Sequence, residues 1–326
     1  MSARCHRTLL HTIIALQVAC WSASRAAEAI RPAGPIGGTD IQQALLPPPG
    51  FYAAAVVAPV DLFSFSTPSG SFPASGHSVD AGVGLLWVYG VQVFGGSLAS
   101  SVSLAYGHSC FQLRGQPEFC SKGGLDDTYA DVLVWSRFFP SEEFASDGNA
   151  FARIPYGLAV QIGLGVVFPT GTYDVHRPLN NSANFYDIAP NIALTYNLHS
   201  LLGEKLGDAT ELSMRVWLNN YTENHETHYQ SGRLFNVDFS ITQRLSHWQY
   251  GLWGTAFKQI QDDVVSGVSV PNGGARAHGV AIGPVISYSF VEGSRPWNVT
   301  LKGLYAISAM NAAWPRGIVL RVATRF

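Results

Sequence analysis

Apolar and polar residues alternate along many strand-length segments of this chain, and this period of two constrains the fold more than any other feature. In one segment the aliphatic residues Leu212, Met214 and Val216 are separated by mostly polar residues. The next segment repeats the pattern with Phe235, Val237, Phe239 and Ile241. Because successive side chains of a β-strand point to opposite faces, the alternation predicts strands with one apolar and one polar face.

About twelve segments with strand character follow one another from residue 51 onward, separated by clusters of Gly, Pro, Asn, Asp and Ser. Their approximate limits are 51–66, 79–94, 100–108, 126–138, 153–168, 187–198, 209–223, 233–245, 247–261, 276–290, 296–307 and 314–326. An even number of strands, each of roughly ten residues, is typical of barrels that span the outer membrane. The sequence therefore predicts an all-β fold, an antiparallel transmembrane β-barrel of about twelve strands.

A soluble β-sandwich would show the same alternation, so composition is needed to choose between the two folds. Charged residues make up 13% of the 326 residues, roughly half the share that is usual in soluble domains. Aromatic residues recur near predicted strand ends, for example at Tyr221, Trp248, Tyr288 and Trp297, where a membrane interface would hold them. Both features favour the membrane barrel.

Other classes of protein fit the composition poorly. The mean hydropathy of +0.12 is too low for a bundle of membrane helices. The formal net charge is −2 and no basic run occurs, so we expect no nucleic-acid partner. An aromatic content of 12% argues against a disordered chain.

The start of the chain is typical of a secretory signal peptide. Arg4 and Arg7 precede a mostly apolar stretch at 9–21, and Ala27-Glu28-Ala29 fits a small-x-small cleavage site. A short membrane anchor and a lipid-modified Cys20 remain alternatives. We therefore predict a signal peptide at 1–29, a proline-rich, non-strand leader on the periplasmic side at 30–50, and a transmembrane β-barrel domain at 51–326.

Two cysteines remain after removal of the predicted signal peptide, Cys110 and Cys120. Exported proteins meet an oxidising environment, so two cysteines this close together are expected to form a loop-closing disulfide. A reactive thiol pair is the alternative.

Residues that face the inside of the predicted barrel are the candidates for solute contact. If the alternation is phased correctly, they are Arg215, Trp217, Asn219, Asn236, Asp238, Lys302, Arg321 and Arg325. Arginine and tryptophan could hold a carboxylate or an aromatic ring through ion pairing or cation–π contact. Alternatively, Arg321, Arg325 and Asp238 pair with one another and plug the lumen.

The last predicted strand places Phe326 on the same face as Ile318, Leu320 and Val322. A terminal aromatic residue on an alternating strand resembles the signal used in outer-membrane barrel assembly. We therefore expect Phe326 to be an assembly signal and the barrel-assembly machinery to be a partner.

Three motifs in the second half of the chain carry a family resemblance. They are Pro169-Thr170-Gly171, then Thr227-His228-Tyr229-Gln230-Ser231-Gly232, and then Gln259-Ile260-Gln261-Asp262-Asp263. In this order and spacing, roughly over residues 150–326, they resemble a family of outer-membrane β-barrels associated as transporters with the phenol meta-degradation pathway. His228 and Gln230 stand where that family tends to have Asp and Arg.

The resemblance implies a barrel in the outer membrane of a Gram-negative bacterium. It also implies a shared motif loop, which in this chain consists of Pro169, Thr170, Gly171, Thr227, Tyr229, Ser231, Gly232, Asp262 and Asp263.

The sequence offers little for catalysis or for binding a metal. His225 and His228 flank Glu226 without the spacing of a helical zinc motif, so we interpret them as part of a solvated loop. Asp262-Asp263 could hold calcium but is better explained as a turn. No Gly-x-Ser-x-Gly elbow is present. We expect no enzyme, cofactor or metal.

The function predicted from the sequence is a passive outer-membrane channel for small hydrophobic or aromatic compounds, with the lipid bilayer as its surroundings. A structural or sensory barrel with a plugged lumen is the alternative, and a lipid-modifying enzyme is a more remote one.

Overall fold

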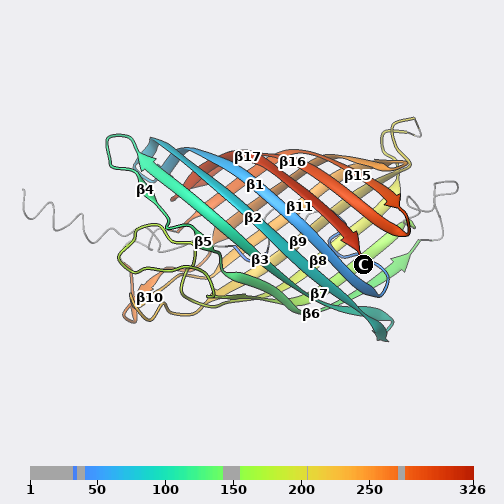
Figure 1. Ribbon diagram of the computed structural model, residues 1–326, viewed down its shortest axis with the longest axis horizontal. Coiled ribbons are helices and arrows are strands. Elements are labelled where there is room, and N and C mark those ends of the chain that lie inside the picture. Colours follow the sequence, from blue (N-terminus) through green and yellow to red (C-terminus); the bar gives the residue numbers. More distant parts are fainter. Residues whose placement is uncertain (1–31, 35–40, 142–154, 204, 271–275) are drawn as a thin grey trace, which may run out of the picture.

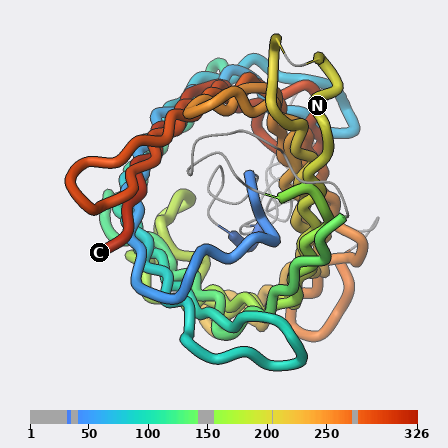
Figure 2. The backbone as a smooth tube through the Cα atoms, turned by 90° about the vertical axis from the view of Figure 1, so that its right-hand side faces the viewer, coloured from blue at the N-terminus to red at the C-terminus, as the bar shows by residue number. Residues whose placement is uncertain are grey.

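The structure is a computed structural model that describes residues 32–34, 41–141, 155–203, 205–270 and 276–326. In these residues twelve long antiparallel strands form a closed barrel (Figures 1 and 2). They are β1 (Gly50–Thr67), β2 (Gly70–Val93), β3 (Gly96–Leu113), β6 (Thr128–Pro140), β7 (Gly157–Phe168), β8 (Asp187–His199), β9 (Ala209–Tyr221), β11 (Leu234–Leu245), β12 (Trp248–Gln259), β15 (His278–Glu292), β16 (Arg295–Met310) and β17 (Ala312–Arg325). None of the described residues lies in an apolar helix long enough to cross a membrane.

The period of two in the sequence produces the two faces of the wall. Along β8 the residues Ile188, Ile192 and Tyr196 are exposed on the outside, while Asn191 and Thr195 are buried on the inside. The other strands repeat this alternation, so the outer surface is apolar and the interior is mostly polar. This is the arrangement that a barrel in lipid requires.

Pairing of the first strand with the last closes the wall. β1 pairs with β17 from Tyr52 opposite Arg325 to Ser66 opposite Ala312, and its other edge pairs with β2. Closure leaves no strand edge unpaired in hydrocarbon, where each unsatisfied backbone group costs several kcal/mol. The predicted antiparallel barrel of about twelve strands is confirmed.

Strands β2 and β3 are longer than the predicted segments 79–94 and 100–108. Their pairing continues to Ala74 opposite Leu113, and β2 pairs with β1 as far as Gly70. The added part of β2 is rich in serine and lacks the apolar alternation, so only its backbone pairing defines it as a strand.

The two ends of the barrel differ in their connections. At one end, β3 to β6, β7 to β8, β9 to β11 and β12 to β15 are joined by long loops, and two further connections are short. At the other end, β2 to β3, β11 to β12 and β15 to β16 are joined by two-residue turns, while β6 to β7 and β8 to β9 have longer connections. Short turns are typical of the periplasmic end and longer loops of the extracellular end. Short strands lie in the long loops: β4 (Phe119–Cys120), β5 (Gly124–Leu125), β10 (Tyr229–Gln230), β13 (Val264–Val265) and β14 (Val268–Ser269).

The leader occupies a different place from the one we predicted. Its described residues, 32–34 and 41–49, form no strand, but they lie inside the barrel rather than on its periplasmic side (Figure 2). We call these residues the lumen segment. A proline-rich stretch with no periodicity carries no signal for where it packs, which explains the error. The predicted signal peptide lies outside the described residues.

Candidate functional site

Five residues on three strands form a connected polar and aromatic cluster inside the barrel, which we call the lumen cluster. They are Tyr129 and Asp131 on β6, Asn191 on β8, and Arg215 and Trp217 on β9. Arg215 Nη2 donates to Asp131 Oδ1 at 2.5 Å and to Asn191 Oδ1 at 2.8 Å. The Trp217 indole N–H donates to the Tyr129 hydroxyl at 3.2 Å, and that hydroxyl donates to Asp131 Oδ1 at 2.8 Å.

The cluster also contains a cation over a ring. The Arg215 guanidinium carbon lies 4.8 Å from the centre of the Trp217 ring. Such contacts are worth about 2 kcal/mol or more when they are desolvated. The side chains of Arg215 and Asp131 are only 5% and 9% exposed, so this ion pair is shielded from bulk water.

A glycine on β7, Gly165, leaves the space in which the cluster forms. β7 lies between β6 and β8 in the wall, and a Cβ atom at Gly165 would lie 2.7 Å from the Tyr129 hydroxyl. Because glycine has no Cβ, the Tyr129 ring can lie across β7 and reach toward β9. A larger residue at position 165 would displace Tyr129.

Residues 32–34 of the lumen segment cover this cluster. The Ala33 N–H donates to Asn219 Oδ1 at 2.7 Å, and Asn236 Nδ2 donates to the Ala33 carbonyl at 3.0 Å. Gly34 lies against the Trp217 indole, where a Cβ would be only 2.9 Å from ring atom Cζ2. Gly34 also has a φ of +91°, which favours glycine. Trp217 is consequently 0% exposed.

Residues 41–49 of the lumen segment bind the wall through backbone N–H groups. The N–H groups of Gln42, Gln43 and Ala44 donate to Glu211, Ser213 and Thr195 at 2.8, 3.0 and 3.1 Å. Glu211 also forms a buried ion pair with Arg244. The segment is therefore held by wall side chains that would otherwise line an open pore.

Apolar side chains of the lumen segment fill space between distant strands. Ile41 packs against a group of residues that includes Trp253 on β12 and Leu304 on β16. Leu46 packs against a second group, which includes Val88 on β2 and Val134 on β6. The segment thus contacts opposite sides of the barrel.

The structure places most of the predicted lumen residues inside the barrel. Arg215, Trp217, Asn219, Asn236, Asp238 and Lys302 are all buried. Asp238 lies opposite Arg215 in the strand register, and Lys302 Nζ lies 4.9 Å from the Trp253 ring centre. Arg321 is half-buried, with a guanidinium nitrogen 3.4 Å from Asn298 Oδ1.

Arg325 is the exception to this prediction. It is exposed, its guanidinium donates to the Pro49 carbonyl at 2.8 Å, and it lies over the Tyr52 ring at 5.8 Å. Arg325 is the last residue of β17, so it reaches the rim of the barrel rather than the lumen. Alternation predicts which side of the wall a residue faces but not its depth.

Sequence reasoning missed Tyr129, Asp131 and Asn191. Their positions on the inner faces of predicted strands 126–138 and 187–198 were a usable signal. The pairing of Arg215 with Asp131 could not be read from the sequence, because it depends on how four neighbouring strands are staggered.

Two of the three family motifs, Thr227–Gly232 and Gln259–Asp263, meet in the loops at the extracellular end. Asp263 is 0% exposed and accepts three hydrogen bonds, from the Tyr229 hydroxyl at 2.6 Å, the Gly232 N–H at 2.8 Å and Gln259 Nε2 at 2.6 Å. β10 pairs with β13 beside this carboxylate. Asp263 therefore joins the β9–β11 loop to the β12–β15 loop.

The remaining motif residues also make local contacts. Thr170 accepts from the Thr128 N–H at 3.1 Å, and the Gly171 N–H donates to Asp127 Oδ1 at 3.0 Å. The Thr227 N–H donates to the Asn224 carbonyl at 3.3 Å. Asp262 pairs with Arg276 at 2.5 Å. Pro169 directly precedes Thr170 on the β7–β8 loop.

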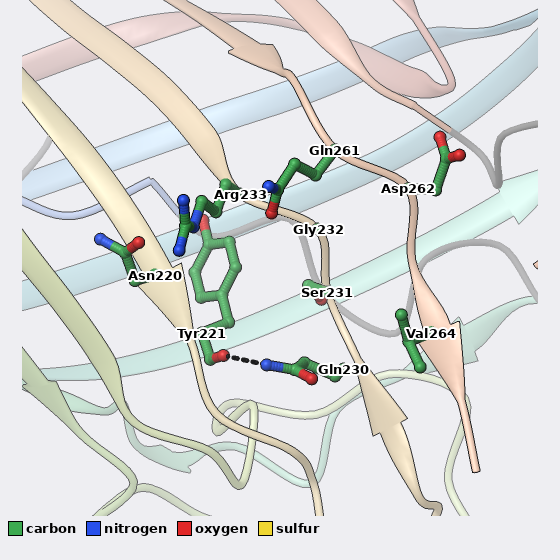
Figure 3. A pocket seen from close by; sticks show the side chains of 9 residues that line it. All are labelled: Asn220, Tyr221, Gln230, Ser231, Gly232, Arg233, Gln261, Asp262 and Val264. Atoms are coloured by element: carbon green, nitrogen blue, oxygen red, sulfur yellow. Dashed lines mark hydrogen bonds between the residues drawn. The ribbon is translucent and has the colours of Figure 1, made fainter. Parts of the chain in front are cut away.

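A small pocket of about 200 Å³ lies between the same two loops (Figure 3). It is lined by Asn220, Tyr221, Gln230, Ser231, Gly232, Arg233, Gln261, Asp262 and Val264. Gln230 Nε2 donates to the Tyr221 carbonyl at 2.8 Å across one side of it. The pocket brings motif residues to the mouth of the barrel but lies apart from the lumen cluster.

The two other predicted features lie on the wall. Cys110 and Cys120 are joined by a disulfide between β3 and β4. Phe326 is 62% exposed and stacks on Phe51, with the ring centres 6.4 Å apart.

Replacing Asp263 with alanine should loosen the two extracellular loops. Hydrogen bonds to a charged group are worth about 1.5–3 kcal/mol each, so the amide of Gly232 should exchange with solvent at least about tenfold faster. Hydrogen exchange of the purified barrel measures this. Asp262→Ala is the matched control, because its ion pair is exposed and worth less than about 1 kcal/mol. Equal effects of the two changes would contradict a special role for Asp263.

Comparison with known proteins places the chain among bacterial outer-membrane barrels. Residues 63–315 match the sequence profile of the family described as "Putative MetA-pathway of phenol degradation". No curated protein sequence matches the chain.

One solved structure shares the fold, and a second is reported for comparison only. An outer-membrane channel from Pseudomonas putida has a TM-score of 0.62 and 12% sequence identity, covering 91% of this chain and 99% of that chain. The transport unit of the autotransporter AIDA-I from Escherichia coli has a TM-score of 0.49 and 9% identity, covering 90% and 94%. At these identities the likeness concerns the fold alone.

Proposed function

Because the chain belongs to this family of phenol-degradation MetA-pathway proteins, we propose that it is a passive conduit for small hydrophobic or aromatic molecules. The protein is a β-barrel of the Gram-negative outer membrane, and its apolar outer face contacts the lipid bilayer. As part of the same proposal, the barrel-assembly machinery inserts it, with Phe326 as the recognised residue.

The observation that carries this proposal is that a separate stretch of chain lies in the lumen. It is held to the wall by hydrogen bonds at Ala33, Gln42, Gln43 and Ala44. None of these hydrogen bonds belongs to a strand pairing, so the segment can shift while the wall stays intact. The lumen segment is therefore a removable constriction.

The lumen cluster favours an aromatic solute. The face of Trp217 against which Gly34 packs is a flat, apolar surface beside the Arg215 cation and the Tyr129 hydroxyl. An aromatic ring that replaced Gly34 there would stack on the indole, and a carboxylate or hydroxyl on that ring could bind the neighbouring polar groups.

Flux through the reconstituted barrel tests this function. We expect liposomes containing the protein to swell faster in isotonic benzoate than in isotonic acetate, after correction for protein-free vesicles. Trp217→Ala should reduce the preference for benzoate, whereas Trp248→Ala, which changes an exposed tryptophan on the outer wall, should leave it unchanged. Swelling no faster than that of protein-free vesicles would exclude a conduit.

A closed structural or sensory barrel is the second candidate. The packing of Ile41 and Leu46 against opposite sides of the wall favours it, since together they bridge the barrel. In that case neither conductance nor solute flux would be measurable for the wild-type protein.

A further inference from the structure

The outer wall carries a group of metal-binding residue types that the lumen function does not use. Cys110 on β3 lies directly opposite His77 on β2 and directly opposite Cys120 on β4. Residues that oppose each other in neighbouring strands share a face, and so do residues two apart in one strand, which adds His108. Both histidines are exposed, and Tyr106, two residues before His108, is 57% exposed on the outside. All four side chains therefore belong to the outer face of the wall.

The distances of three of these residues fit one metal ion, and Cys120 is bonded to one of the three. The potential ligand atoms of His77, His108 and Cys110 lie within 4.8 Å of one another, and Cys110 Sγ is 3.6 Å from His108 Nε2. Around tetrahedral Zn²⁺, with Zn–S near 2.3 Å and Zn–N near 2.1 Å, a sulfur and a nitrogen ligand are separated by about 3.6 Å. Ligand atoms of Cys110, Glu118 and Cys120 also lie within 4.8 Å of one another.

The disulfide decides whether the site exists. Thiolate is the sulfur species that binds metals, and both sulfur atoms are now bonded to each other. In this state neither sulfur is a thiolate, and only the two imidazoles and the Glu118 carboxylate remain as candidate ligands. After reduction, two thiolates and two imidazoles would complete the Cys₂His₂ set that is common in structural zinc sites.

We propose that His77, His108, Cys110 and Cys120 form a redox-controlled Zn²⁺ site on the outer wall. A dithiol gives two electrons to the disulfide, so the S–S bond breaks and the dithiol becomes a cyclic disulfide. The two protons of the dithiol pass to Cys110 and Cys120, and they leave to solvent when Zn²⁺ binds the thiolates. Oxidation of the pair reverses these steps and releases the metal.

Metal binding to the full-length barrel in detergent tests this site. A phosphine reductant is suitable, because phosphorus supplies the two electrons and water supplies both the oxygen of the phosphine oxide and the two protons. We expect the reduced protein to bind equimolar Zn²⁺, and Co²⁺ to give thiolate charge-transfer and tetrahedral visible bands. The oxidised protein should bind at least about 100-fold more weakly, since even groups that only orient a ligand are worth roughly 10–100-fold.

Histidine variants distinguish the site from adventitious binding. His77→Ala and His108→Ala leave the disulfide in place and should each weaken Zn²⁺ binding by the reduced protein by at least about 100-fold. His225→Ala, in the β9–β11 loop, should have no effect. Unchanged affinity in the double variant His77→Ala/His108→Ala, equal binding by oxidised protein, or no binding by reduced protein that retains its heat-modifiability on gels would overturn the proposal. None of these outcomes bears on solute flux through the lumen.

Discussion

A variant that lacks residues 30–46 is expected to have a conductance in planar bilayers at least about threefold higher than that of the wild-type protein. A twelve-stranded barrel is wider than the eight-stranded barrels whose lumen wall side chains can just fill. Ala33, Gly34, Ile41 and Leu46 pack against wall residues inside this barrel. Removing them leaves the polar side chains of β8, β9 and β11 facing water, and ions can then pass.

A single substitution should reproduce part of this effect. A Cβ at Gly34 would lie 2.9 Å from the Trp217 ring, so Gly34→Ala should push the lumen segment away from the indole and raise the conductance. Gly115→Ala is the matched control, because Gly115 also has a positive φ, +82°, but nothing lies within 4 Å of its Cβ position. If the deletion variant conducts no better than the wild type, the wall itself closes the lumen.

The strands could be predicted because their signal is local. Alternation of residues such as Leu212 and Met214 with Ser213 and Arg215 records the two faces of each strand within a few positions. The assignment of Arg215, Trp217 and Asn219 to the inner face needed nothing more. Lipid on one side and an enclosed interior on the other impose this pattern on almost every strand.

The site itself depends on features that are not local. Arg215 binds Asp131, 84 positions away, because the stagger of β6, β7, β8 and β9 brings the two residues to the same depth. The lumen segment binds through backbone N–H groups and small residues, which leave no periodic trace in the sequence. Gly34 and Gly165 matter through the absence of a side chain, and only the neighbouring ring in three dimensions reveals this.

The loop motifs lie between these two cases. The motif residues could be found from their order and spacing. The sequence does not show, however, that neighbours within the pairs Ser231-Gly232 and Asp262-Asp263 have different roles. Asp263 is buried and accepts three hydrogen bonds, whereas its neighbour Asp262 forms a partly exposed ion pair. Which member of the pair is buried follows from the fold of the loops.

Arg215→Ala is expected to lower the free energy of unfolding by about 3–5 kcal/mol while the barrel still assembles. The change leaves the buried Asp131 without its cation, and among the residues that the structure describes only the Tyr129 and Ser101 hydroxyls still donate to it. Denaturant unfolding in detergent measures the loss. The double variant Arg215→Met/Asp131→Asn should recover part of it, because the buried charge at position 131 is then removed, whereas Asp238 opposite Arg215 keeps its carboxylate.

Two comparisons test whether burial is the cause. Asp174→Asn breaks an exposed ion pair with Arg177 and should cost less than about 1 kcal/mol. Combining Arg215→Ala with deletion of residues 30–46 should shrink the penalty for Arg215→Ala, because water then enters the lumen and solvates Asp131. A penalty of under 1 kcal/mol in the intact chain would mean that water already reaches this carboxylate past the lumen segment, and the segment could not then be the constriction that limits flux.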